Sequence, residues 1–143
     1  MKITLFILFN LFVSLIYTQE FVGEFNKVRP DSAFENIHVH QISSNVNSTT
    51  FAIWVKRKVK IHKHENHVEN IYITQGEGRF HLGATTYHVE PGDLIVVPKN
   101  TWHGIEVTST IPLRVISIQS PEFFGEDRVF NSYSSAFGRP SKL

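Results

Sequence analysis

Histidines gather in one short stretch of the chain: His62, His64 and His67 lie within six residues, and Glu69 follows them. Residues two apart on a β-strand point to the same face, so His62 and His64 can direct both imidazoles at one point. His103 follows a Pro/Asn turn much further along the chain. Imidazoles and a carboxylate are donors that divalent transition metals accept. The sequence therefore predicts a metal site.

Three imidazoles and one carboxylate suit Mn²⁺, Fe²⁺, Ni²⁺, Cu²⁺ or Zn²⁺, and the coordination geometry must choose among these ions. Four protein ligands on an octahedral ion leave two positions for water or substrate, as an oxygenase, an oxidase or a Lewis-acid catalyst requires. Glu69 can then serve as a ligand and as a transient base. His67 is interpreted as a solvent-exposed loop residue rather than as a further ligand.

The elements that must position these side chains are short β-strands. From Phe51 onward, apolar residues alternate in short runs separated by Gly, Pro, Asn and Ser, with a hairpin turn expected at Gly83 and another turn at residues 91–93. A first strand is expected around His38 to His40, and the tail from Pro121 is expected to form loops or a short edge element. No stretch after the amino-terminal segment has sustained helical periodicity. This pattern predicts an all-β antiparallel sandwich or barrel.

Two motifs resemble those of the cupins. His62-Lys63-His64-(four residues)-Glu69-(six residues)-Gly76 is similar to the first cupin motif, and Gly92-(five residues)-Pro98-Lys99-Asn100-Thr101-Trp102-His103 is similar to the second. The resemblance covers roughly residues 51–118. It implies an antiparallel jelly-roll β-barrel, a homodimer, and an internal metal held by His62, His64, Glu69 and His103. Asn100 replaces a motif glycine, and since Asn tolerates positive φ we expect the turn to form.

Strand parity extends the prediction to the cavity. If Glu69 and His103 point inward, so do the apolar residues at two-residue spacing from them, together with one threonine: Ile71, Ile73, Thr101, Ile105 and Val107. No arginine or lysine is placed beside the ligands by this parity. A dicarboxylate such as oxalate would need such a cation, so we expect an apolar or aromatic substrate.

Length and composition narrow the classes of partner. The 143 residues are 41% hydrophobic, carry a formal net charge of +1 and contain no cysteine, which predicts one globular domain without thiolate metal sites. The basic cluster at residues 56–60 is interpreted as a solvated strand face, and nucleic-acid binding is not expected. Trp102 and the aromatic tail residues Phe123, Phe124 and Phe130 are candidates for contacts in the homodimer.

The amino terminus resembles a secretory signal peptide, with Lys2 followed by an apolar run. We expect cleavage after Thr18, so that 1–18 is the signal and 19–143 the mature domain. An uncleaved segment would instead anchor the protein to a membrane. Asn47 starts an N-glycosylation acceptor in an expected surface loop. The final Ser141-Lys142-Leu143 resembles a peroxisomal address, which we interpret as fortuitous because the amino-terminal signal emerges first.

These observations favour a secreted, metal-binding protein that acts as a metal-dependent oxidoreductase of the dioxygenase type on a small organic substrate. The alternative is a module of the same fold that binds a small ligand without chemistry, and the sequence leaves the choice open.

Overall fold

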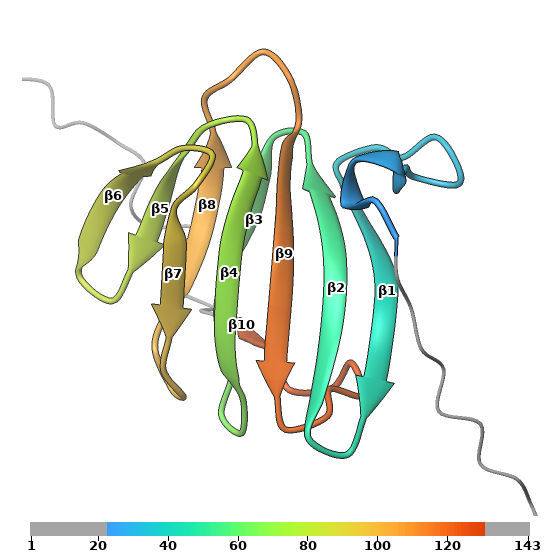
Figure 1. The fold of residues 1–143 in the computed structure, drawn as a ribbon. Helices are drawn as coiled ribbons and strands as arrows, with labels where there is room; N and C mark the ends of the chain where they lie inside the picture. Colours follow the sequence, from blue (N-terminus) through green and yellow to red (C-terminus); the bar gives the residue numbers. More distant parts are fainter. Residues whose placement is uncertain (1–22, 131–143) are drawn as a thin grey trace, which may run out of the picture.

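A computed structural model describes residues 23–130 (Figure 1). Within these residues, the strands form two five-stranded antiparallel sheets, ordered β1-β2-β9-β4-β7 and β10-β3-β8-β5-β6. The elements are η1 (Phe25–Lys27), β1 (Ile37–Asn45), β2 (Ser48–Val55), β3 (Lys58–Lys63), β4 (Val68–Gln75), β5 (Gly78–Leu82), β6 (Thr85–Val89), β7 (Leu94–Val97), β8 (His103–Val107), β9 (Leu113–Ser120) and β10 (Val129–Phe130). The predicted all-β jelly-roll architecture is confirmed.

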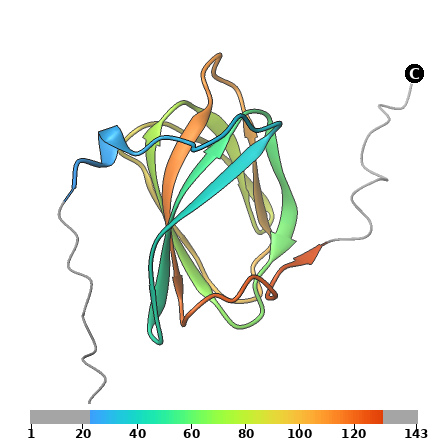
Figure 2. The same ribbon diagram turned by 90° about the vertical axis from the view of Figure 1, so that its right-hand side faces the viewer.

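The two sheets face each other and enclose one core (Figure 2). Burial follows strand parity: on β4, Ile71 and Ile73 are buried while Tyr72 between them is exposed. The core consists of apolar side chains from both sheets: Val55, Ile71, Ile73, Phe80, Val89, Val97, Ile105, Leu113 and Val115. Burying these side chains is the main driving force for the pairing of the sheets.

Two special backbone positions set the approach of β8 to its neighbours. Asn100 adopts φ 60°, so the expected left-handed turn forms before β8. On β8 itself, a Cβ added at Gly104 would lie 2.8 Å from the carbonyl oxygen of Val59 on β3. Glycine therefore allows β3 and β8 to pair closely, and this pairing sets His62 directly opposite His103.

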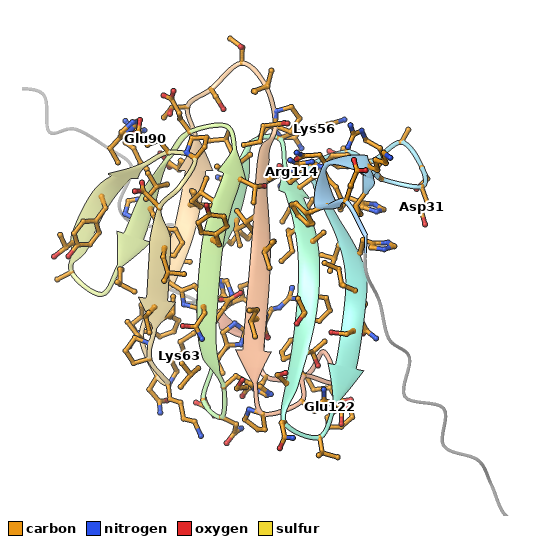
Figure 3. The ribbon with its side chains drawn as sticks, in the orientation of Figure 1. Asp31, Lys56, Lys63, Glu90, Arg114 and Glu122 are labelled. Carbon is orange, nitrogen blue, oxygen red and sulfur yellow. The ribbon has the colours of Figure 1, made fainter. Side chains whose placement is uncertain are left out.

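After β9 the chain crosses one end of the barrel and ends in β10, which pairs with β3 (Figure 2). We call this stretch, residues 121–130, the C-terminal strap. The expectation of loops or a short edge element is confirmed for these residues, which contain a loop and the edge strand β10. Figure 3 shows Lys63, at the end of β3, and Glu122, on the strap, at the same end of the barrel, away from Arg114.

The surface residues singled out from the sequence differ in their exposure. Asn47 lies exposed in the turn between β1 and β2, as predicted for a surface loop. The prediction of Phe123 as an interface residue is wrong, because Phe123 is buried and packs edge-on against Phe51. Phe124 and Phe130 are exposed and Trp102 is half-buried, so the homodimer stays a prediction.

The expected signal peptide, its cleavage point and the carboxyl-terminal tripeptide lie outside the described residues. Among residues 23–130, no helix has the length and apolar character needed to cross a membrane.

Candidate metal centre

The structure brings the four predicted ligands together from both sheets. His62 lies on β3 opposite His103 on β8, His64 follows the end of β3, and Glu69 lies on β4 of the facing sheet. All four side chains are buried. The ring centroid of His103 lies 4.3 Å from that of His62 and 5.3 Å from that of His64. One nitrogen of each imidazole lies within 4.8 Å of the other two, a spacing that can surround one metal ion.

Backbone carbonyls orient the three imidazoles. The Nδ1 of His62 lies 2.8 Å from the carbonyl oxygen of Lys60, and that of His103 lies 2.9 Å from the carbonyl oxygen of Thr101. The Nδ1 of His64 likewise lies 2.9 Å from the carbonyl oxygen of Asp127 on the strap. A carbonyl oxygen only accepts, so each Nδ1 carries the hydrogen and each Nε2 carries a lone pair.

Free lone pairs in a buried site are the feature that fits a metal. The Nε2 atoms of His64 and His103 are buried and have no hydrogen-bond partner among residues 23–130. The Nε2 of His103 also lies 3.2 Å from an oxygen of Glu69. A lone pair and a carboxylate oxygen at this distance repel unless a cation or a proton lies between them. The residues therefore fit a divalent metal.

The Glu69 carboxylate is held at its other oxygen. Its Oε1 accepts hydrogen bonds from the Ser117 hydroxyl at 2.5 Å and from the Gln119 amide at 3.2 Å. Burial alone would raise the pKa of Glu69, but positive charge at His103 and His64 and the hydrogen bond from the Ser117 hydroxyl lower it below the usual range. The carboxylate is thus ionised when a cation, either a proton on an imidazole or a metal ion, lies between Oε2 and the imidazoles.

Burial and the neighbouring His103 lower the pKa of His62 to about 4. The imidazole of His62 is therefore neutral at physiological pH, as a metal ligand must be.

The strap supplies a second layer of contacts that the sequence did not predict. Asp127 accepts hydrogen bonds from the backbone N–H groups of Glu65, Asn66 and His67 and from the Asn66 side chain. Its Oδ2 also lies 2.5 Å from the Nδ1 of His67, while the Nε2 of His67 lies 2.9 Å from the carbonyl oxygen of Glu122. His67 is buried, so the prediction of an exposed loop residue is wrong: the strap covers it.

A cavity of about 90 Å³ adjoins the candidate ligands. Its walls are mainly aliphatic and include the predicted Ile71, Ile73 and Ile105, which confirms an apolar pocket. Arg128 also lines the cavity, so the cavity has a cation that strand parity did not place there. Parity along the barrel strands could not find Arg128, because the strap brings it there. Arg128 therefore offers a partner to an anionic ligand.

A family model described as Cupin domain matches residues 49–119. Together with the double-sheet barrel, this match places the chain in the cupin superfamily.

An uncharacterized protein of Methanocaldococcus jannaschii is 34% identical over 73 residues, which cover 51% of this chain and 58% of that relative. The chain thus spans less than two thirds of this curated relative. The structure of KdgF from Halomonas sp. is similar with a TM-score of 0.61 and 22% identity, covering 68% of this chain and 92% of KdgF. Pac13, a nucleoside dehydratase from Streptomyces, is similar with a TM-score of 0.59 and 21% identity, covering 71% of this chain and 87% of Pac13. At these identities the structures share the fold.

Proposed function

We propose that this cupin is a metal-dependent enzyme that acts on a small organic molecule, with His62, His64, Glu69 and His103 as the metal ligands. One observation carries the proposal: the three imidazoles are oriented by backbone carbonyls, and the buried Nε2 atoms of His64 and His103 lack hydrogen-bond partners among the described residues beside the Glu69 carboxylate. The cost of burying such groups without a partner is about 1–3 kcal/mol each, and a bound cation would remove it.

A divalent transition metal at this site supplies Lewis acidity and, where the ion is redox-active, electron transfer. Four protein ligands leave room in an octahedral shell for substrate or dioxygen. The aliphatic wall favours apolar occupants, which supports an oxidoreductase of the dioxygenase type. Mn, Fe, Ni or Cu would agree with that chemistry, whereas Zn would favour Lewis-acid catalysis.

The protein's own groups prepare the site. Ser117 and Gln119 fix the Glu69 carboxylate, and the low pKa of Glu69 suits a ligand better than a proton acceptor at neutral pH. The similarity to Pac13, described as a nucleoside dehydratase, supports the proposal that a single barrel of this size can hold a complete active site.

The test is the metal content of protein purified without nickel resin. We expect about one divalent ion per chain in the wild type and near-complete loss in His103→Ala. The matched control is His88→Ala, since the His88 side chain is 59% exposed and lies outside the cavity. A wild type without metal, or His103→Ala with full metal, would refute the ligand assignment.

A second experiment separates catalysis from binding. A small molecule that co-purifies with the metal-loaded protein is incubated aerobically and followed by mass spectrometry. Its conversion, lost in His103→Ala, supports the enzyme. Its recovery unchanged after prolonged incubation would support the non-catalytic binding module instead.

We also propose that the chain is secreted, on the basis of the basic start and apolar run before residue 17. A fluorescent-protein fusion that carries the whole chain, with its carboxyl-terminal tripeptide left at the end, should be exported. Retention in the cytosol or in peroxisomes would contradict this proposal.

A further inference from the structure

Arg128 reaches the cavity from the strap, and the backbone on both sides of it is fixed. Asp127 is hydrogen-bonded to the loop before β4, and Val129 pairs with β3. Alternation along β10, extended back by one residue, places Arg128 on the same face as Phe130, whose ring centroid lies 5.8 Å from that of His62. The strap therefore directs Arg128 toward the candidate ligands, in agreement with its place in the cavity wall.

The guanidinium of Arg128 is distinguished by what it does not contact. It lies 5.4 Å from the ring centroid of Phe123, and it forms neither a hydrogen bond nor an ion pair with any of residues 23–130. All the other described arginines have a polar partner: Arg29, Arg57, Arg79 and Arg114. Arg128 is exposed to solvent while it also lines the cavity, and its donors have no acceptor among the described residues.

The cavity limits what can supply that acceptor. Its volume of about 90 Å³ corresponds to roughly six to nine water-sized spaces, at about 10–15 Å³ for each. Apart from Arg128 and the polar groups at the metal site, the walls are mainly aliphatic, with Phe80 among them. The occupant that fits is small, with an apolar body and one anionic group.

We propose that Arg128 binds the carboxylate of a small monocarboxylic acid whose apolar part lies against the aliphatic wall. This inference rests on the proposed function and names the substrate class for the same site. The planar guanidinium matches a carboxylate with two parallel hydrogen bonds. One guanidinium balances one carboxylate charge, whereas a phosphate dianion would require more donors than Arg128 offers.

The test measures binding of isovalerate, a branched carboxylate, and of isovaleramide, its neutral analogue of nearly the same size. Both are titrated calorimetrically into wild type, Arg128→Gln and Arg128→Lys, with and without added Zn²⁺. Inorganic phosphate is titrated in a parallel series. The matched control is Arg79→Gln, since Arg79 is exposed, is paired with Glu106 and is not part of the cavity wall.

We expect Arg128→Gln to weaken isovalerate binding by about tenfold or more and to change isovaleramide binding by less than about twofold. Arg128→Lys should bind isovalerate more tightly than Arg128→Gln but less tightly than the wild type, because lysine keeps the positive charge and lacks the planar pair of donors. Arg79→Gln should match the wild type.

Three results would overturn the inference. These are equal isovalerate binding by wild type and Arg128→Gln, equal weakening of both probes, and no saturable isovalerate binding by the wild type. Arg128-dependent binding of phosphate that is tighter than that of isovalerate would overturn the assignment to a carboxylate. Metal content measured on the same samples tests the proposed function separately, and the series without Zn²⁺ tests Arg128 even where that function fails.

Discussion

Replacing Asp127 with Asn changes one side chain that connects the strap to the candidate metal centre. The Asp127 carboxylate accepts five hydrogen bonds: Oδ1 from the Glu65 N–H and the Asn66 amide, and Oδ2 from the Asn66 N–H, the His67 N–H and His67 Nδ1. The Asn variant has nearly the same shape but replaces one acceptor oxygen by an NH₂ group. The NH₂ group would face two donors at the position of Oδ1 or three at the position of Oδ2, so either amide orientation loses the hydrogen bonds at that position.

The magnitude follows from the contacts that disappear. A hydrogen bond to a charged group contributes about 1.5–3 kcal/mol, and neighbouring bonds are not additive, so we expect Asp127→Asn to lower the free energy of unfolding by about 3 kcal/mol. For a domain of this size that corresponds to a fall in Tm of roughly 10–20 °C. The backbone carbonyl of Asp127 also orients His64. Because the variant loosens the strap that holds this carbonyl in place, metal affinity should fall by about tenfold.

The effect should depend on pH with a defined sign. Burial would raise the pKa of Asp127, but the bonds from His67 and from the backbone of Asn66 and Glu65 lower it from 3.8 to about 2. A lowered pKa stabilises the fold above the unfolded value and loses that contribution as pH falls toward 2. The difference between wild type and variant should therefore be full at pH 7 and shrink between about pH 4 and pH 2.

The assay is thermal unfolding followed by circular dichroism, in EDTA and then with added metal. Asp31→Asn is the control, because the Asp31 side chain is 78% exposed, and it should change stability by less than about 0.5 kcal/mol. An Asp127→Asn variant with the Tm of the wild type at pH 7 would refute the role of the strap.

Three further predictions concern the barrel itself. Ser117→Ala should raise the pKa of Glu69 and weaken metal binding by about tenfold, as measured by competition with a chelator; unchanged affinity would contradict the role of the hydroxyl. Gly104→Ala should cost about 1–3 kcal/mol in urea unfolding, because its Cβ would meet the Val59 carbonyl; wild-type stability would show that the strands can separate freely. His62 becomes protonated near pH 6.5 in the unfolded chain but only near pH 4 in the folded chain, so the Tm of the metal-free protein should fall as the pH is lowered from 6.5 to 4. The fall should be smaller in His62→Gln, and an equal fall in both proteins would contradict this origin.

Much of the barrel and part of the candidate ligand set could be predicted from local spacing, whereas His103 was assigned through the resemblance of its motif to the second cupin motif. Alternation with a period of two placed Ile71 and Ile73 inward, and the spacing of His62 and His64 placed both imidazoles on one face. The turn at Asn100 followed from its tolerance of positive φ. Each of these inferences uses residues close together in the chain.

The strap depended on tertiary structure, because its contacts join residues about sixty positions apart. Nothing in the spacing around Asp127 shows that it binds the loop at His67, and strand parity cannot place Arg128, which lies beyond the last long strand. The path of the chain after β9 decides both contacts. That path buries His67, orients His64 and brings a cation to an otherwise apolar cavity. The type of candidate site was therefore indicated by local sequence motifs, whereas the polarity of the adjoining cavity was decided by how the chain closes the barrel.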